Sequence, residues 1–374
     1  MTLPLGDLLV ADFSRVLAGP LVGQTLGDLG ADVIKVESPG GDDTRAWKPP
    51  VDAAGGATYY QAANRNKRSV VLDLKVAGDN ARARRLCERA DVVVSNFKPG
   101  SLERFGLGYE ETAARNPGVV YCEISGFGEE AGADLPGYDP LVQAVGGLMS
   151  ITGPPGHPSK AGVALVDVIA GLYATTAVLA ALRERDRSGR GQRITINLLH
   201  AVLAALVNQA SGWLAGGVAP KASGNVHPSI EPFATYRARD GELMICAGND
   251  RQFRALVDEL GRPELADDAS FATNAARVAN RDALRPLLEA ALGADSCESW
   301  AARLAAAGVP AGPINDVPSA FAYAAALGLG ATAEVEGVPT VPFPAALSRT
   351  PAVLRRRPPA LDEQGDEIRM WLAS

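Results

Sequence analysis

Histidine and cysteine are scarce in this chain, and basic residues are fewer than acidic ones. It has 3 histidines and 4 cysteines in 374 residues. No two histidines have the spacing of ligands on one helix face, so no metal cofactor is expected. The cysteines form no Cys-x-x-Cys pair, which is typical of reduced, buried thiols. Lys and Arg number 36 against 43 Asp and Glu, so the net charge is −7. The composition therefore provides no overall positive field for binding nucleic acid or an anionic membrane.

Two further signals are missing. Residues 1–7 show no basic segment followed by an apolar one, so we expect no secretory signal and a cytoplasmic protein. No Gly-x-Ser-x-Gly motif is present to hold a nucleophilic serine. The chemistry is therefore expected to depend on carboxylates, backbone amides and a bound organic group.

One carboxylate stands alone in a long apolar run. Asp167 is the single charged residue between residues 161 and 182. A carboxylate in apolar surroundings is costly unless it is hydrogen-bonded or neutral, which makes Asp167 a functional candidate. Two plainer interpretations stay open: a core helix whose acid pairs locally, and a membrane span of about 20 residues. The central acid, the glycines and the lack of a second such run argue against the span.

The first 130 residues alternate strand-like and helix-like patterns. Apolar strands joined by helix-length connections indicate a parallel sheet covered on both faces, hence an α/β fold. Helical patterns cover residues 19–29 and 79–89. The predicted strands are residues 8–13, 32–37, 69–74, 91–95 and 119–125.

The character of the chain changes near residue 225. A strand-like run at 242–247 leads into an amphipathic helical pattern at 250–260, and Ala-rich helical sequence continues to about residue 307. We predict a large domain over 1–224 and a smaller α+β domain over 225–325. The Pro-rich segment 326–374 is expected to return to the large domain.

The first strand–helix–strand unit superficially resembles a dinucleotide-binding fold. A true Gly-x-Gly-x-x-Gly after the first strand is missing, and Pro20 removes an amide that a pyrophosphate would need. Glu37, at the end of the second strand, is a candidate to accept a hydrogen bond from a ribose or an adenine, or else is a surface acid. A nicotinamide-dependent dehydrogenase is therefore a weaker alternative.

Basic residues gather between positions 65 and 104. Such a cluster in an acidic protein indicates an anionic small ligand, for example a nucleotide with phosphates, although a solvated face is the plainer interpretation. The segment 95–104 follows a strand, and open α/β sheets bind ligands at the carboxyl ends of strands. The cluster consists of Arg65, Lys67, Arg68, Lys75, Lys98 and Arg104.

Segments spread over nearly the whole chain resemble the class III CoA-transferase family, which includes formyl-CoA and carnitine-type CoA-transferases. The α-methylacyl-CoA racemases are close relatives of the same fold. The order and spacing of the segments together carry the resemblance. They are Asp12–Pro20, Leu29–Glu37, Asn66–Lys75, Ser95–Gly100, Ser188–Gln192, Gly224–Pro228, Ala247–Phe253, Val309–Ile314 and Arg356–Pro359.

The resemblance implies a role for Asp167 as the nucleophile, followed by the expected Gly171. The carboxylate would attack an acyl-CoA thioester, and a mixed anhydride and an aspartyl-CoA thioester would follow in turn. Because burial raises a carboxyl pKa, we expect amide or helix-terminus donors to keep this acid ionised. The same donors would stabilise the tetrahedral oxyanion.

The resemblance also implies a CoA site, with coenzyme A or acyl-CoA as substrate and no tightly bound cofactor. Val16 and Ala18 would line the pantetheine or adenosine path. The other implied CoA contacts are Leu72 and Leu74 around the adenine, and Lys75, Asn96 and Arg104 on the phosphates.

Four further positions are substrate-side candidates. Leu17 departs from the polar residue of formyl-CoA transferases, which argues against oxalate-type acyl recognition. Tyr138 stands where the racemases have a histidine, and a tyrosine is a poor base at neutral pH, so a transferase is favoured over a racemase. Tyr138 would close over the thioester, or else pack as a buried aromatic. Asn225 and His227 lie in a stretch matching a small-domain loop, where His227 would touch substrate or stabilise its own turn.

The family resemblance implies a Rossmann-like large domain and an interlaced homodimer. It implies an acyl-CoA donor and a carboxylic acid acceptor as partners, with no nucleic acid or membrane. A CoA-binding protein without turnover is a further alternative, which the retained Asp167 disfavours.

Overall fold

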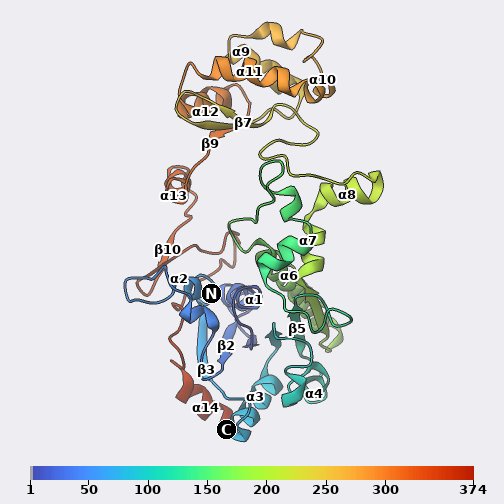
Figure 1. The fold of residues 1–374 in the computed structure, drawn as a ribbon. Coiled ribbons are helices and arrows are strands. Elements are labelled where there is room, and N and C mark those ends of the chain that lie inside the picture. The colour runs from blue at the N-terminus through green and yellow to red at the C-terminus, as the bar shows by residue number, and fades with distance from the viewer. Residues whose placement is uncertain (1–2) are drawn as a thin grey trace. The chain divides into compact units, whose positions relative to one another are not determined.

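The computed structural model describes residues 3–374, which form two units (Figure 1). Unit 1 contains residues 3–149, 160–219 and 330–374, and unit 2 contains residues 150–159 and 220–329. The predicted boundaries at 225 and 326 thus lie within five residues of the observed ones. The prediction had placed residues 150–159 in the large domain, whereas the structure groups them with unit 2.

Unit 1 is built on a parallel six-stranded sheet in the order β3-β2-β1-β4-β5-β6. This confirms the α/β prediction. The strand β3 begins two residues before the predicted start, and β6 was not predicted. The strands are β1 (Leu9–Asp12), β2 (Asp32–Glu37), β3 (Lys67–Val71), β4 (Val92–Ser95), β5 (Val120–Ser125) and β6 (Arg193–Asn197). A separate hairpin is formed by β10 (Ala333–Val335) and β11 (Val338–Thr340).

Nine α-helices and three short 3-10 helices accompany these strands among the described residues. The α-helices are α1 (Ala18–Asp28), α2 (Thr58–Ala62), α3 (Ala77–Arg89), α4 (Tyr109–Ala113), α5 (Asp139–Val145), α6 (Leu165–Ser188), α7 (Leu198–Ala205), α8 (Val207–Gly216) and α14 (Gly365–Ala373). The 3-10 helices are η1 (Asp43–Ala46), η2 (Glu103–Phe105) and η3 (Met149–Ile151), the last of which crosses the boundary between the units.

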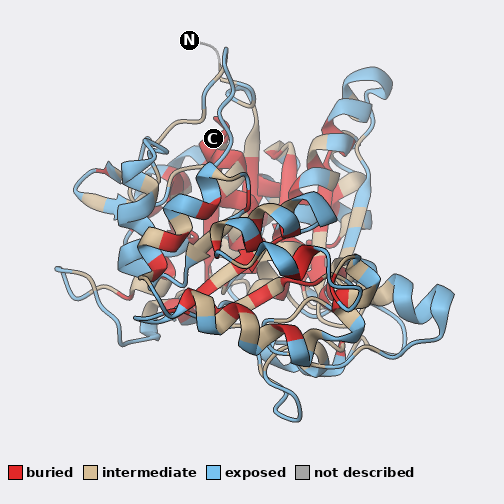
Figure 2. Cartoon of the chain, turned by 90° about the horizontal axis from the view of Figure 1, so that it is seen from above, coloured by how far each residue is buried: buried red, intermediate tan, exposed pale blue. Residues whose placement is uncertain are grey.

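Successive strand residues belong to two different hydrophobic cores. Val10 and Val92 pack in one core with α1, α5, α6 and α7, while Ala11 and Val93 pack in the other with α3, α4 and α14. This alternation follows from the two-residue period of a strand, because neighbouring side chains point to opposite faces. The buried residues form the interior seen in Figure 2.

The helix α6 is uncharged from residue 165 to residue 182 apart from Asp167, and its last turns are charged. By length and composition it could cross a membrane, and the pair α7–α8, bent by 82°, passes the same test. In the folded chain α6 packs against α1, α7, β5 and β6, and eight of its residues are buried. Such packing is that of a core helix, one of the interpretations open from the sequence.

The C-terminal segment closes the free edge of β3. The backbone amides of Ser69 and Val71 donate to the side chains of Gln364 (2.9 Å) and Asp362 (2.8 Å), respectively. The Gln364 amide donates in return to the Ser69 carbonyl (3.1 Å). An unpaired edge strand is thereby covered rather than left open to another chain.

Unit 2 combines a three-stranded antiparallel sheet, in the order β7-β8-β9, with helices. Its strands are β7 (Phe233–Arg237), β8 (Glu242–Cys246) and β9 (Ala311–Pro313). Its helices are α9 (Asp250–Glu259), η4 (Pro263–Ala266), α10 (Asn274–Ala279), α11 (Arg281–Leu292), α12 (Cys297–Ala306) and α13 (Val317–Ala326). A separate core, which includes Phe253 and Trp300, holds this unit together.

Candidate active site

Asp167 lies in the first turn of α6. The first turn of a helix presents backbone N–H groups without partners inside the helix. Here a second acid, Asp139 at the start of α5, takes them: its Oδ1 accepts from the Val166 amide (2.8 Å) and the Asp167 amide (3.4 Å). Asp139 is 4% exposed. The two carboxyl groups are therefore neighbours with different environments.

Gln143 holds Asp139 in place. Its Nε2 donates to Asp139 Oδ2 (2.6 Å), and its Oε1 accepts from the Ala161 amide (2.8 Å). This links α5 to the segment before α6. Because Asp139 is committed to these contacts, the Asp167 carboxyl group is the one left facing open space.

The environment of Asp167 raises its pKa to about 7, through burial and then through the like charge of Asp139. Among residues 3–374, no group donates a hydrogen bond to its carboxylate. From the sequence, we expect helix-terminus amides to hold this acid ionised. That expectation was wrong for the local amides, because Asp139 occupies them.

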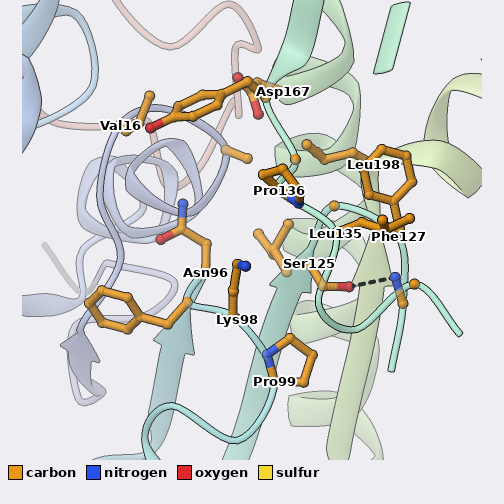
Figure 3. Close-up of a pocket in the computed structure, with 18 of the residues that line it drawn as sticks. Val16, Asn96, Lys98, Pro99, Ser125, Phe127, Leu135, Pro136, Asp167 and Leu198 are labelled. Carbon is orange, nitrogen blue, oxygen red and sulfur yellow. Dashed lines mark hydrogen bonds between the residues drawn. The ribbon is translucent and has the colours of Figure 1, made fainter. Parts of the chain in front are cut away.

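A cavity of about 290 Å³ opens beside Asp167 (Figure 3). Its walls come from the segments that follow β1, β4 and β5, together with Leu198 of α7. The strands β1 and β4 are adjacent in the sheet, and the strand order reverses between them. This is the topological switch point, where open α/β sheets bind their ligands.

The polar groups of this first cavity come chiefly from the segments after β1 and β4. Asn96 joins them: its Oδ1 accepts from the Arg15 amide (2.9 Å) and its Nδ2 donates to the Arg15 carbonyl (2.6 Å). Arg15 and Lys98 are the two cations in this wall, and Lys98 donates to the Asp134 carbonyl (2.9 Å). Asn96 and Lys98 lie along the cavity below Asp167 in Figure 3. The cavity thus offers positive charge for an anionic ligand.

A second cavity, of about 330 Å³, is also lined by Asp167. Its walls include Trp47 and Tyr59, whose rings meet edge to face with centroids 5.0 Å apart. Val16, Tyr138 and Asp167 line both cavities. Asp167 therefore stands where a basic chamber and an aromatic chamber meet.

The structure brings six of the predicted site residues to the first cavity: Val16, Leu17, Ala18, Asn96, Tyr138 and Asp167. Tyr138 is 55% exposed. It is therefore not the buried packing aromatic that the sequence left as an alternative.

The other predicted CoA contacts lie outside the two cavities. Leu72 is 1% exposed in the core on the α3 face of the sheet, and Leu74 packs against the same core. Lys75 and Arg104 are exposed on the segments after β3 and β4. Glu37 is buried in an ion pair with Arg45 (2.7 Å), so it is neither a surface acid nor free for a ribose.

Asn225 and His227 belong to unit 2. His227 Nδ1 accepts from the Ser229 amide (3.1 Å), and its ring packs on Phe233. This is the turn-stabilising role considered for His227. Asn225 Nδ2 donates to the Thr235 hydroxyl (3.4 Å).

Sequence reasoning missed several wall residues. Phe127 and Leu135 follow β5, and the rule that pointed to the segment after β4 applies equally to this strand. Asp139 directly follows Tyr138, and the sequence around it gives no sign that it would be buried beside Asp167. The sequence around Trp47 and Tyr59 does not indicate a site, because only the fold brings the segment between β2 and β3 to the first turn of α6.

Comparisons with known proteins agree with this architecture. The sequence profile of CoA-transferase family III matches residues 5–365. A succinate–glutarate CoA-transferase from Agrobacterium fabrum is 44% identical over 98% of this chain and 94% of its own length. An acetyl-CoA:oxalate CoA-transferase from Acetobacter aceti is 42% identical over 85% of this chain and 82% of its own.

A solved structure shows the same fold. A CaiB/BaiF family protein from Brucella suis is 46% identical and superposes with a TM-score of 0.90 over the full length of both chains. The fold, the profile match and the identities agree with the resemblance noted in the sequence. The chain belongs to CoA-transferase family III.

Proposed function

We propose that this protein transfers CoA from an acyl-CoA to a carboxylic acid, with Asp167 as the covalent nucleophile. The observation that carries the proposal is the position of Asp167 between two cavities at the switch point of the sheet. A carboxylate shared by two chambers can react with a thioester and then with an incoming acid.

The proposed reaction begins when an Asp167 oxygen attacks the thioester carbonyl. The C–S bond breaks, CoA leaves as the thiolate, and an acyl–aspartyl anhydride remains. The thiolate then attacks the Asp167 carbonyl carbon, which releases the donor acid and leaves an aspartyl-CoA thioester. The acceptor carboxylate attacks that thioester, which breaks its C–S bond, releases the thiolate and leaves an acceptor–aspartyl anhydride. The thiolate then attacks the acceptor acyl carbon of this anhydride, and the Asp167 carboxylate leaves as the new acyl-CoA forms. No net proton is gained or lost.

The two chambers suggest a division of the substrate. The basic groups Arg15 and Lys98 suit the CoA portion in the first cavity, while the aromatic wall of the second suits the acyl group or the acceptor. The start of α1 adds backbone donors: Leu17 and Ala18 line the first cavity, and no side chain caps this helix. We propose that their amides stabilise the tetrahedral oxyanion.

A racemase would need a second acid or base opposite Asp167. Among residues 3–374, no histidine lines either cavity. Tyr59, in the second cavity, has its pKa raised by burial and by Asp167, so its hydroxyl stays protonated and is a poor base. These features favour the transferase.

The test is covalent trapping at Asp167. The protein is incubated with succinyl-CoA, the donor suggested by the dicarboxylate relatives, treated with hydroxylamine and mapped by mass spectrometry. We expect a hydroxamate at Asp167, its loss in Asp167→Ala, and its retention in Asp186→Ala, which removes an exposed acid on the same helix. Transfer of CoA to glutarate should follow the same pattern.

Two results would contradict this function. One is the absence of an adduct with succinyl-CoA, glutaryl-CoA and acetyl-CoA under conditions where the protein is folded. The other is exchange of the α-proton of a 2-methylacyl-CoA with solvent deuterium, which would favour the racemase instead.

We also propose that a second copy covers the outer face of α6 to α8. A helix stretch that is uncharged all round needs cover on every side, yet Leu172 is 60% exposed and Tyr173 is 48% exposed on α6. On α8, Trp213 and Leu214 are exposed as well. Light scattering should give twice the monomer mass, and Leu172→Glu with Leu214→Glu should reduce it, whereas Met370→Glu, at an exposed position of α14, should not.

A further inference from the structure

The segment from Ser14 to Leu17 lies between β1 and α1, beside Asp167. Its residues 15–17 line the first cavity, and Val16 lines the second as well. Val16 has a φ of 67°. A β-branched residue in the left-handed region is strained and persists only where its surroundings fix it. The conformation of this wall therefore depends on the side chains that hydrogen-bond to its backbone.

Four charged side chains are buried beneath the segment. They form two ion pairs, Lys35 with Asp42 (2.9 Å) and Lys67 with Asp12 (2.8 Å). Each of the four is at most 2% exposed. Burying two complete ion pairs contributes little stability compared with apolar packing, so their presence calls for another explanation.

The first pair holds the wall by its backbone. Lys35 Nζ donates to the Ser14 carbonyl (2.9 Å), and both Asp42 oxygens lie 3.3 Å from the Val16 amide nitrogen. Asp42 is itself fixed by the Thr44 amide (3.0 Å) and hydroxyl (2.7 Å). Burial opposes the charge of Asp42, but Lys35 and Thr44 lower its pKa to about 2, so it remains an anion and an acceptor.

The second pair holds the start of the wall and the first turn of α1, which follows it. Asp12 Oδ1 accepts from the amide (2.9 Å) and the hydroxyl of Ser14. Lys67 Nζ donates to the Pro20 carbonyl (2.8 Å) and to Asn64 (3.0 Å) as well as to Asp12. Together with Asn96 on Arg15, side chains hold the amides of three consecutive residues, 14 to 16.

We propose that the Lys35–Asp42 pair, supported by Lys67–Asp12, is a positioning device that sets the Val16 wall against the nucleophile Asp167. Neither pair touches the cavities as a reacting group. The pair fixes Val16, a strained residue that lines both chambers, so it controls how the thioester carbonyl is presented to the carboxylate. This inference rests on the proposed function of Asp167.

The first test compares rates of Asp167 acylation in single turnover with saturating succinyl-CoA. We expect Lys35→Met and Asp42→Asn each to slow acylation at least tenfold, with a change of less than threefold in the KM for acyl-CoA. The KM is expected to change little because Asn96, Lys98 and the segment after β5 still form the CoA chamber.

A matched control removes a buried ion pair elsewhere. Asp28 and Arg65 pair at 2.6 Å at the far end of α1, and Asp28 is 1% exposed. Asp28→Asn should lower the melting temperature as the Asp42 variant does, yet leave the acylation rate within twofold of wild type. Equal rate losses in Asp28→Asn and Asp42→Asn would reduce the Lys35–Asp42 pair to a purely structural role.

A double variant separates stability from positioning. Lys35→Met with Asp42→Leu leaves no unpaired charge, so it should be more stable than either single variant. Acylation should nevertheless stay at least tenfold slow, because the Ser14 carbonyl and the Val16 amide have lost their partners. Hydrogen exchange of a peptide covering residues 13–18 should be faster than in wild type. If Lys35→Met, Asp42→Asn and the double variant do not fold, Thr44→Val offers the same test, because it removes the hydroxyl that donates to Asp42.

The outcomes are distinguishable. No wild-type adduct at Asp167 would overturn the proposed function itself. A wild-type adduct together with wild-type acylation and unchanged exchange in Asp42→Asn and the double variant would overturn the positioning role alone.

Discussion

At the scale of single residues, the site depends on two carboxyl groups placed side by side in unlike environments. Asp139 receives the free amides of α6 and the Gln143 side chain, whereas Asp167 receives no donor among residues 3–374. The helix terminus therefore stabilises the structural acid, and the reactive acid is left with a raised pKa. A carboxylate that is poorly stabilised in the free enzyme is a better nucleophile once it is ionised.

The pH dependence of the reaction follows from this arrangement. Because the proposed nucleophile must be ionised, kcat/KM should fall as the pH drops below about 7. Asp139→Asn removes the neighbouring charge, so the acid limb should move to lower pH by roughly one unit. Rate profiles between pH 5 and 9 check this. A limb that stays in place would mean that burial alone sets the pKa of Asp167.

The stability of the fold should fall as the pH rises, whereas kcat/KM should rise. The pKa of Asp167 is higher in the folded chain than the unfolded value of 3.8, so ionisation destabilises the fold, most fully above pH 7. Asp167→Asn should therefore unfold at higher denaturant concentration than wild type, and its advantage should be larger at pH 8 than at pH 5 by about 2 kcal/mol. Urea unfolding at the two pH values measures this, and an equal gain at both would contradict the raised pKa.

At the scale of elements, the position of the site depends on how closely α6 approaches α1. Gly171 lies one turn after Asp167, and a Cβ placed there would lie 3.0 Å from the Ala18 carbonyl oxygen. This glycine lets the helix carrying the nucleophile approach the helix that begins at the cavity wall. The contact joins residues 153 positions apart, which no local pattern reveals.

A larger side chain at this crossing should separate the two helices. Gly171→Val is expected to lower the free energy of unfolding by about 2 kcal/mol and to slow acylation, because the backbone of α1 cannot yield as a flexible side chain can. Gly78→Val in α3 is the matched control, since only the tip of Arg82 lies near an added Cβ there. Its effect should stay within about 0.5 kcal/mol. Similar losses in both variants would show that the helix crossing has no special tightness.

The sequence predicted elements far better than the site. Five strands of the parallel sheet were predicted because each is an apolar run bounded by turns, and β2 was predicted to the residue. The sixth, β6, alternates polar and apolar residues at the sheet edge and follows a 24-residue helix, so it lacked that pattern. Asp167 was found because a charge in an apolar run is costly. The buried lysines beneath Val16 were not, because a lysine in sequence gives no sign that it is buried.

At the scale of the whole chain, its two ends build one unit. Residues 330–374 return to the sheet, where Asp362 and Gln364 pair with the edge of β3 and α14 packs beside it. Arg85 and Arg89 of α3 donate to the Leu372 and Trp371 carbonyls, so the last turn of the chain is held by the third helix. Unit 2 is inserted between these two parts in sequence.

This closure makes a definite prediction about the chain end. Ile368 is 0% exposed in the core under β3, whereas Met370, two residues later on the same helix, is 70% exposed. Ile368→Ala should lower the free energy of unfolding by about 2–4 kcal/mol, and Met370→Ala should change it by less than about 0.5 kcal/mol. Because α14 directly follows Asp362 and Gln364, which cover the edge of β3, the Ile368 variant should also aggregate more readily on mild heating. Denaturant unfolding and light scattering on the two variants measure both effects. Equal behaviour of the pair would mean that the sheet is stable without its C-terminal cover.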